Sequence, residues 1–401
     1  MRLSVQLFLV CFLFCGTDRF VAAADLDLAD GTILKGTLLQ IGQNQFTFQT
    51  EAGTRTVPAA EIIRVVAGKP LANPTRGGLV VLANDDRIHV EILRSEEESI
   101  LVRLSSCPET GEWKIPLETI QSVFFQWPAF QKSQVRLLQK IAQLKKKSDL
   151  FYLKNGDFLE GEFLGFDAQT FRFESNAGET AVPRSGIDFF CFNPELINFP
   201  QPDQLRYRLE LTDGTRLSVS SLVLNKTVIA AKTLFGAELK CRLDRLVSIS
   251  PLGGLVVPLS QLEPSEYQFT PYFTQQWGWR RNRNVVAGPL RVGGREYATG
   301  LGVHSAAELR YTLDGKYAAF QTEVGIDDST NGKGTVEVSI LVDQRVVYQR
   351  SIQGTEQQRA RAVPRIDLSG ARELVLKVEF GKNADIQDLV NWCRPVLILQ
   401  K

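Results

Sequence analysis

The sequence predicts an all-β fold, in which tandem small antiparallel β-barrel or meander repeats precede a C-terminal β-sandwich, with one connecting helix. Three observations predict it. A hairpin turn followed by an alternating strand recurs four times over the first two thirds of the 401-residue chain. The last third contains long runs in which apolar and polar residues alternate, as in strands with one buried face. Only the stretch 128–149 has helical periodicity.

The N-terminal segment 1–24 has the pattern of a signal peptide. Its apolar core, 7–14, is too short to span a bilayer, and Ala-Ala-Ala at 22–24 provides a cleavage site, so the predicted mature chain begins at Asp25. The alternatives are an uncleaved anchor and a lipoprotein modified at Cys15. We therefore expect export to the periplasm, the cell surface or the medium, and no transmembrane segment after cleavage.

Four β repeats are predicted, at 25–70, 76–127, 150–200 and 205–255. Their opening turns are Asp30-Gly31, Asp85-Asp86, Asn155-Gly156 and Asp213-Gly214, whose residue types tolerate positive φ. Each repeat closes with Pro58, Pro116, Pro183 or Arg242, four residues before an apolar residue. A unit of about 40 residues is too small for a deep core, so we expect neighbours to pack together or each unit to curl into a small barrel.

The opening hairpin of these repeats resembles the one that opens Sm- and SH3-like barrels. Sm-like barrels often bind RNA, but this chain has 46 Lys and Arg against 45 Asp and Glu, and no basic stripe. We therefore expect no nucleic-acid partner, and a role for the repeats as a scaffold or in protein contact.

The helical stretch 128–149 is predicted to connect two pairs of repeats. Its apolar residues fall on one face, and three lysines at 145–147 lie at its C-terminal end, where the helix dipole favours cations. Contact of this cationic end with a membrane surface is the alternative interpretation.

Four cysteines remain after the signal peptide: Cys107, Cys191, Cys241 and Cys393. They are far apart and form no C-x-x-C pair, so they do not predict a metal site. Export would permit disulfides between them, and buried free thiols are the alternative.

Beyond a linker at 251–269, alternating runs joined by short turns predict a jelly-roll or related sandwich over 263–401. The motifs of this part are Tyr297, G-x-G-x-H-S at 300–305, L-D-G-x-Y at 313–317, V-G-I-D-D at 324–328 and the region of Trp392. With them, the run 297–348 resembles the NPCBM/NEW2 module, a carbohydrate-binding module associated with glycoside hydrolase family 98. The chain departs from the family pattern at Gln344 and Asn391.

The resemblance implies a galactose-binding-like sandwich that binds sugar. Sugar sites need planar donors and acceptors for hydroxyl groups and an aromatic face for the ring. The candidate contact residues are His304, Asp327, Asp328, Asn391, Trp392 and Arg394. For His304 the alternative is a buried histidine that holds its loop, for Trp392 it is core packing, and for the two aspartates it is capping of a turn.

The segment 327–332 was compared with a calcium-binding loop. Asp327, Ser329 and Asn331 match the first half of an EF-hand loop, but its twelfth position is Val338 and not the bidentate glutamate. We therefore expect a turn and no cofactor, with a structural Ca²⁺ as the alternative.

No sequence motif predicts catalysis. The chain has no H-E-x-x-H, G-x-S-x-G or P-loop, and only two histidines, His89 and His304. Gly300 and Gly302 are interpreted as residues that permit a tight loop beside His304. The expected function is that of an exported, non-catalytic carbohydrate-binding protein whose partner is a glycan or glycoprotein. The alternative is an envelope or extracellular protein-interaction or assembly module without sugar binding.

Overall fold

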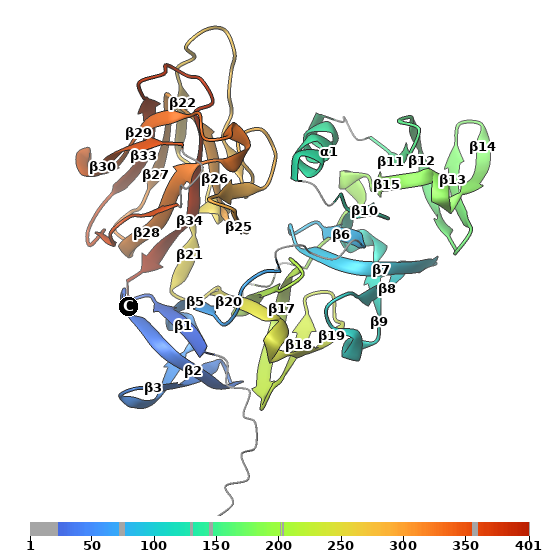
Figure 1. Ribbon diagram of the computed structural model, residues 1–401, viewed down its shortest axis with the longest axis horizontal. Helices are drawn as coiled ribbons and strands as arrows, with labels where there is room; N and C mark the ends of the chain where they lie inside the picture. Colours follow the sequence, from blue (N-terminus) through green and yellow to red (C-terminus); the bar gives the residue numbers. More distant parts are fainter. Residues whose placement is uncertain are drawn as a thin grey trace, which may run out of the picture.

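The structure is a computed structural model that describes residues 23–71, 77–128, 131–143, 147–200, 202, 204–354 and 360–400. Four small β units stand in a row beside a two-layered β-sandwich (Figure 1). Helix α1 (Gln131–Gln143) is the one α-helix of the described residues, so the prediction of an all-β fold with a connecting helix is confirmed. No helix in these ranges is long and apolar enough to cross a membrane. Most of the predicted signal peptide, 1–22, lies outside the described residues.

Each β unit has five antiparallel strands in one repeated connection pattern. In unit one, the first strand pairs with both the second and the fifth, and the third and fourth follow the second. A three-residue 3₁₀ helix joins the fourth strand to the fifth. The strands are β1 (Ala23–Leu28), β2 (Ile33–Gly42), β3 (Gln45–Thr50), β4 (Gly53–Pro58) and β5 (Ile62–Val66) in unit one; β6 (Gly78–Leu82), β7 (Arg87–Glu96), β8 (Ser99–Leu104), β9 (Glu112–Pro116) and β10 (Ile120–Phe124) in unit two; β11 (Asp149–Leu153), β12 (Phe158–Phe166), β13 (Thr170–Ser175), β14 (Gly178–Pro183) and β15 (Ile187–Cys191) in unit three; and β16 (Arg206–Leu211), β17 (Arg216–Asn225), β18 (Val228–Thr233), β19 (Glu238–Arg242) and β20 (Leu246–Leu252) in unit four.

The first hairpin of every unit turns on an Asx residue. In unit one, the Asp30 carboxylate accepts a hydrogen bond from the backbone N–H two residues later (2.8 Å), and Gly31 has a φ of 92°. In unit two these places belong to Asn84 and to Asp85, which has a φ of 67°. The predicted turn at Asp85-Asp86 is therefore wrong by one residue, because Asp tolerates the left-handed conformation that glycine adopts in the other units.

The long second strand of every unit is bent at an irregularity in its pairing with the third strand. The shifts fall between Leu38 and Gln40, Ile92 and Arg94, Phe163 and Gly165, and Val219 and Ser221. A β-bulge bends a strand and increases its twist, which lets a sheet this small curl around its own apolar residues. One apolar core runs through all four units, so the units both curl and pack together.

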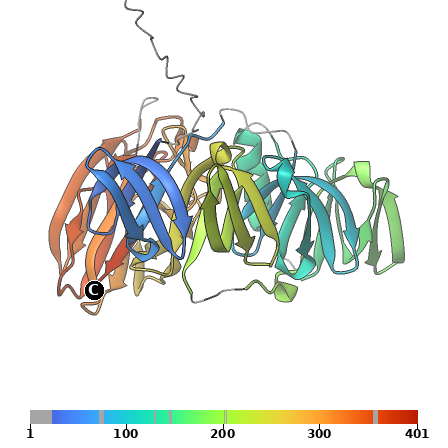
Figure 2. The ribbon, with the colours of Figure 1, turned by 90° about the horizontal axis from the view of Figure 1, so that it is seen from below.

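The spatial order of the units is one, four, two, three (Figure 2). Units one and four share an antiparallel pairing of their fifth strands, with Val66 opposite Ser248. Units two and three pair their fifth strands in the same way, with Ser122 opposite Cys191. The chain therefore leaves unit one, builds units two and three, and returns to place unit four beside unit one.

Units four and two, at the centre of the row, meet mainly through side chains. The buried carboxylate of Asp86 accepts hydrogen bonds from the backbone N–H and the hydroxyl of Ser218 (2.7 and 2.9 Å). Trp113 donates from Nε1 to the carbonyl oxygen of Glu238 (2.8 Å). These contacts satisfy buried polar groups, which makes the interface specific as well as apolar.

Helix α1 covers the junction between units two and three (Figure 1). Its Leu137 and Ile141 pack against a cluster that contains Phe124 and Phe189, one from each unit. The helix therefore packs on the pair formed by units two and three. The lysines at 145 and 146 lie outside the described residues, so contact of the helix end with a membrane stays a hypothesis.

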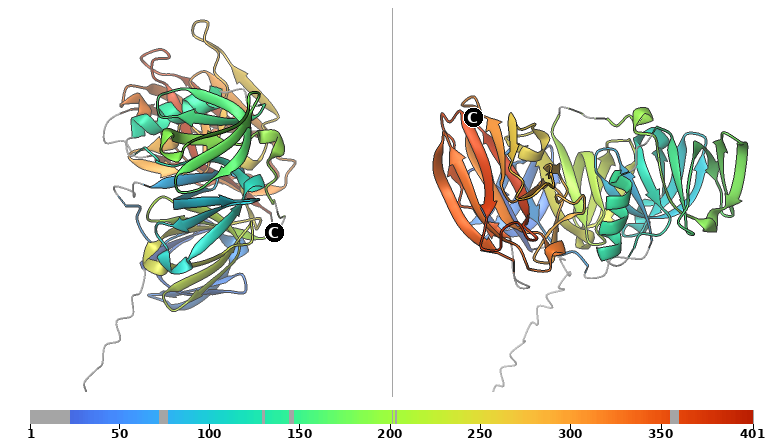
Figure 3. Two further views of the ribbon diagram at one scale, coloured as in Figure 1. Left: turned by 90° about the vertical axis from the view of Figure 1, so that its right-hand side faces the viewer. Right: turned by 90° about the horizontal axis from the view of Figure 1, so that it is seen from above.

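The sandwich consists of two antiparallel sheets that face one another (Figure 3). One sheet has the order β23-β26-β34-β28-β31, with β21 beside β34 and β32 beside β28, and the other has the order β22-β27-β33-β29-β30. A separate hairpin is formed by β24 (Leu290–Val292) and β25 (Arg295–Tyr297). The remaining strands are β21 (Val256–Pro258), β22 (Glu266–Phe269), β23 (Arg280–Arg281), β26 (Gly300–His304), β27 (Ala307–Thr312), β28 (Tyr317–Ile326), β29 (Thr335–Val342), β30 (Arg345–Gln353), β31 (Arg361–Ala362), β32 (Ile366–Asp367), β33 (Glu373–Phe380) and β34 (Leu389–Leu399).

Gly300 and Gly302 lie in strand β26 and not in a tight loop. Neither glycine has a positive φ. A Cβ on Gly302 would lie 2.3 Å from the carbonyl oxygen of Arg283. The loop interpretation is therefore wrong, and Gly302 is needed because a neighbouring backbone approaches too closely for a side chain.

Candidate functional site

The six residues predicted to contact sugar lie in four separate places. Asp327, Asp328 and Asn391 are close to the β24–β25 hairpin, Trp392 is in the sandwich core, Arg394 faces the β units, and His304 lies beside the loop that follows β22. All six residues are of types that suit sugar recognition, but the structure places only Asp327, Asp328 and Asn391 close to one another.

Asp327 is the centre of a buried polar cluster. Its carboxylate accepts hydrogen bonds from the side-chain amides of Asn391 (2.6 Å) and Asn284 (3.0 Å) and from the hydroxyl of Ser329 (2.5 Å). Burial raises the pKa of Asp327, and these hydrogen bonds lower it by less. Asp328 accepts from two backbone N–H groups of the β24–β25 turn (2.7 and 2.8 Å), so both aspartates hold the hairpin in place.

This cluster does not fit a calcium ion. Each oxygen of Asp327 already accepts from nitrogen or hydroxyl donors, whereas Ca²⁺ requires six to eight oxygen ligands that are free to coordinate it. Within the described ranges, no group of three or more His, Cys, Asp or Glu side chains is placed to hold a metal ion. The segment acts here as a capped turn.

Trp392 is fully buried between the two sheets, with no exposed surface. It packs with other apolar residues of the sandwich core, among them Phe320 and Tyr311. An aromatic platform for sugar needs one ring face open to solvent, which Trp392 does not offer in this structure.

Arg394 faces the side of the sandwich that meets the β units. It forms an ion pair with Glu323, and its guanidinium lies 5.6 Å from the ring centre of Tyr297. Burial and then the nearby Arg64 and Arg295 lower the pKa of Arg394 to about 9. This residue therefore belongs to a different site from the other candidates.

His304 contacts a loop that carries several aromatic residues. The loop between β22 and β23 contains Tyr272, Phe273 and Trp277, and it projects beyond the sandwich next to β22 (Figure 1). The Trp277 ring stacks on the His304 ring, with centres 4.9 Å apart and planes within 5° of parallel. Burial lowers the pKa of His304, so the imidazole is neutral near pH 7. We call these four residues the aromatic edge.

Two residues of the aromatic edge are largely open to solvent. Tyr272 is 51% exposed and Phe273 is 75% exposed, and their rings contact each other edge to face at 4.8 Å. Trp277 is partly exposed, while its stacking on His304 holds the ring in one orientation. Exposed apolar side chains that lie together can mark a binding surface, and the rings of Tyr272 and Phe273 are in contact.

A cavity of about 270 Å³ lies next to the aromatic edge. Its wall includes Thr270, Glu308, Lys377 and Phe380, and the ring of Phe380 contacts Tyr272 at 5.4 Å. Hydroxyl, carboxylate and ammonium groups are the hydrogen-bonding partners that sugar hydroxyls need, and aromatic faces pack on sugar C–H groups. The aromatic edge and this cavity therefore combine aromatic faces with charged and hydroxyl groups on one side of the sandwich.

Sequence reasoning identified His304 but missed the aromatic loop. The signal was present, because four aromatic residues occur between 272 and 279 in a segment without strand periodicity. Core aromatics occur at alternating positions in strands, and aromatics in an irregular polar segment have no strand face to fill.

The described geometry can be compared with known proteins. Residues 256–398 match the NPCBM/NEW2 domain family. A Renibacterium salmoninarum protein named "Putative endo-alpha-N-acetylgalactosaminidase" is 36% identical over 91 residues, which is 22% of this chain and 6% of that relative's length. The chain thus corresponds to a small part of that relative.

Two solved structures are similar at low sequence identity. The structure of CBM51 from Clostridium perfringens GH95 in complex with methyl-galactose is 20% identical, covering 35% of this chain and 99% of that chain with a TM-score of 0.31. The tandem CBM51 modules of a Streptococcus pneumoniae family 98 glycoside hydrolase are 12% identical, covering 80% and 88% with a TM-score of 0.30. By the family model alone, the C-terminal sandwich of this chain, at residues 256–398, matches the NPCBM/NEW2 domain, as its sequence motifs predicted.

Proposed function

We propose that this chain is an exported, non-catalytic carbohydrate-binding protein that holds a glycan at the aromatic edge of its sandwich. The observation that carries the proposal is the loop between β22 and β23, which stacks Trp277 on His304 and leaves the rings of Tyr272 and Phe273 open to solvent next to a cavity lined by Phe380 and charged residues. The family match over 256–398 supports the same function. The four β units serve as the scaffold from which the sandwich is presented.

The chemistry of the aromatic edge suits an open site of moderate affinity. Exposed Tyr272 and Phe273 provide apolar surface for the C–H side of a sugar ring, and the neutral imidazole of His304 fixes Trp277 without adding charge. Open sites of this kind correspond to millimolar to micromolar dissociation constants, or roughly −4 to −8 kcal/mol.

A glycan array followed by calorimetric titration of the full chain tests the proposal. We expect Phe273→Ala to weaken glycan binding about two- to tenfold, because an aromatic contact contributes about 0.5–1.5 kcal/mol. The matched control is Leu196→Ala, since Leu196 is 71% exposed on the distant unit three. Binding of no glycan by the folded chain, or equal effects of the two substitutions, would overturn the proposal.

A protein-interaction or envelope-assembly module is the second candidate function. The observation that favours it is the edge strand β30, where Val346 and Val347 are 55% and 47% exposed. An exposed apolar edge strand can pair with a strand of another protein. Pull-down from extract with and without deglycosylation separates the two functions, because capture that survives deglycosylation supports the protein-interaction module.

A further inference from the structure

A cavity of about 330 Å³ lies where units one and four meet the sandwich, and we call it the junction cavity. Unit one contributes Ile63 to its wall, unit four contributes Pro251, and the sandwich contributes Tyr297 and Val396. It shares no lining residue with the aromatic edge or with the cavity beside it. Because three parts of the fold form its wall, the junction cavity exists only in the assembled chain.

The junction cavity has an excess of positive charge. Its wall contains four carboxylates and six arginines, which leaves two positive charges in excess: Arg64, Arg208, Arg216, Arg295, Arg365 and Arg394. Arginine is always charged at physiological pH, and its planar guanidinium matches the oxygens of a carboxylate, sulfate or phosphate. The lining therefore favours an anionic ligand.

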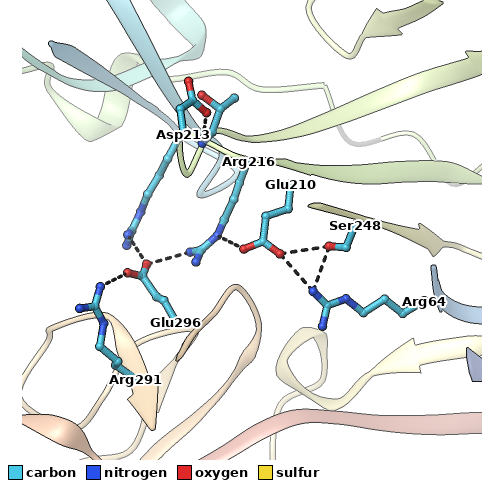
Figure 4. Close-up of polar contacts among 9 residues, drawn as sticks. Arg64, Glu210, Asp213, Arg216, Ser248, Arg291 and Glu296 are labelled. Carbon is cyan, nitrogen blue, oxygen red and sulfur yellow. Dashed lines mark hydrogen bonds and ion pairs between the residues drawn. The ribbon is translucent and has the colours of Figure 1, made fainter. Parts of the chain in front are cut away.

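Three of the carboxylates are already neutralised by ion pairs, and Figure 4 shows those of Glu210 and Glu296. Glu210 accepts from Arg64 at 3.2 Å, and Glu296 accepts from Arg216 at 3.1 Å. Glu296 also binds Arg291 at 3.1 Å, which lies outside the cavity wall. Glu323 forms an ion pair with Arg394 on the sandwich side of the cavity.

Three arginines of the wall keep their charge available. Arg208, Arg295 and Arg365 form no ion pair with any residue in the described ranges. The remaining carboxylate belongs to Asp27. Burial raises the pKa of Asp27, and Arg394 and other nearby arginines oppose this shift. One carboxylate against three arginines leaves the same excess of two positive charges inside the cavity.

Burial and two neighbouring arginines together disfavour the protonated form of Arg394. Burial, followed by repulsion from Arg64 and Arg295, lowers the pKa of Arg394 to about 9. An oxyanion in the cavity would interact favourably with the guanidinium groups of Arg64, Arg295 and Arg394. Its negative charge would raise the pKa of Arg394 again.

The rest of the wall suits the body of an organic molecule. The Tyr297 ring is held between Arg295 and Arg394, whose guanidinium carbons lie 5.0 and 5.6 Å from the ring centre. Ile63 and Val396 add aliphatic surface. A volume of about 330 Å³ is at the lower end of the range of small-molecule sites, about 300–1,000 Å³.

We propose that the junction cavity binds a small organic oxyanion, a molecule of about monosaccharide size with a carboxylate, sulfate or phosphate group. Arg208, Arg295 and Arg365 recognise the anionic group, and Tyr297 with the aliphatic wall contacts the body. The bound ligand touches both the sandwich and the β units, so it stabilises their association. This site goes beyond the glycan site and does not depend on it.

The test uses the full chain and calorimetric titration with four probes: glucuronate, glucose 6-phosphate, neutral glucose and inorganic sulfate. We expect both organic anions to bind in the junction cavity and neutral glucose not to bind there. We expect the double variant Arg208→Gln, Arg295→Gln to remain folded and to bind both organic anions at least about tenfold more weakly. A tenfold change corresponds to about 1.4 kcal/mol of binding free energy. The control variant Arg350→Gln on β30 leaves binding unchanged, and so does Phe273→Ala in the aromatic edge.

The relative affinities of the probes identify the anionic group. If glucuronate binds more tightly than glucose 6-phosphate, the natural ligand carries a carboxylate group. If glucose 6-phosphate binds more tightly, the natural ligand is a phosphate ester. Inorganic sulfate that binds as tightly as both organic anions overturns the proposal, because the body of the ligand then contributes nothing. The proposal also fails if no anion binds at about 10 mM or if the double variant binds as the wild type does. If the double variant is unstable, the exposed Arg365→Gln variant alone replaces it.

Discussion

Glu296 links the sandwich to two of the β units through ion pairs, and its replacement provides a sharp test of the structure. Its carboxylate forms ion pairs of 3.1 Å with Arg87 of unit two, Arg216 of unit four and Arg291 of the sandwich (Figure 4 shows the last two). Glu296→Gln keeps the size of the side chain and removes its charge. Three partly buried arginines then share a neutral amide.

The pKa of Glu296 sets the expected magnitude. Burial alone would raise this pKa, but Arg216, Arg87 and Arg291 together outweigh burial and lower it from 4.5 to about 2. At 1.36 kcal/mol per pH unit, this depression corresponds to about 3 kcal/mol of stability. Breaking a buried ion pair costs about 3–5 kcal/mol. We expect a value near the lower limit of this range, about 3 kcal/mol, because the Glu296 side chain is 22% exposed to solvent.

The same pKa gives the direction of the pH dependence. A carboxyl whose pKa is lowered by folding contributes its full stability above its unfolded pKa, here about 4.5, and loses it as the pH falls towards 2. The wild type and Glu296→Gln should therefore differ by about 3 kcal/mol at neutral pH and converge in acid.

Urea unfolding at pH 7 and at pH 3, followed by circular dichroism and tryptophan fluorescence, measures both effects. The matched control is Glu160→Gln, because Glu160 is an exposed glutamate on β12 without an ion pair among the described residues. We expect no change in the control. A loss below about 1 kcal/mol in Glu296→Gln at pH 7, or a loss that is the same at both pH values, would refute the reasoning.

Three further predictions concern buried residues of the two interfaces and the core. Trp392→Ala should destabilise the sandwich by about 3–5 kcal/mol in thermal or urea unfolding, because the ring is fully buried, and a change within about 1 kcal/mol would contradict this. Asp86→Ala should cost about 1–3 kcal/mol because it leaves the donors of Ser218 unpaired; Asp157→Ala, at the equivalent exposed turn of unit three, is the control. The thiols of Cys107 and Cys241 are fully buried, and contact with Cys107 followed by burial raises the pKa of Cys241, so neither thiol should react with iodoacetamide in the folded chain; alkylation of either thiol before unfolding in urea would contradict this.

Local interactions explain why the β units were predictable. An Asx side chain followed by a residue that tolerates positive φ forms a hairpin turn from neighbours in the sequence alone. The fifth strands begin at Ile62, Ile120, Ile187 and Leu246, the apolar residues that follow each closing residue by four positions. The error at Asn84 and Asp85 has the same local origin, because two consecutive aspartates offered two registers for one turn.

The candidate site was only partly predictable, because side-chain type does not determine exposure. Asp327 and Asn391 have groups that suit sugar recognition, yet the structure uses them to hold a hairpin. Trp392 lies in β34, where nearly every residue is buried, and belongs to the core. The sequence shows the aromatic residues around Phe273 but not their exposure, which the fold of the loop determines.

The sequence by itself determined the all-β class, the fourfold repeat, three of the four opening turns and the family resemblance of the C-terminal sandwich, because these depend on alternation and on motifs within short segments. Only the tertiary structure decided the order of the units, in which β20 returns to pair with β5 across about 180 residues of chain. The junction cavity has the same origin, since its arginines come from three parts of the fold. Contacts between such distant segments depend on the free energy of the whole assembly, which no local pattern encodes.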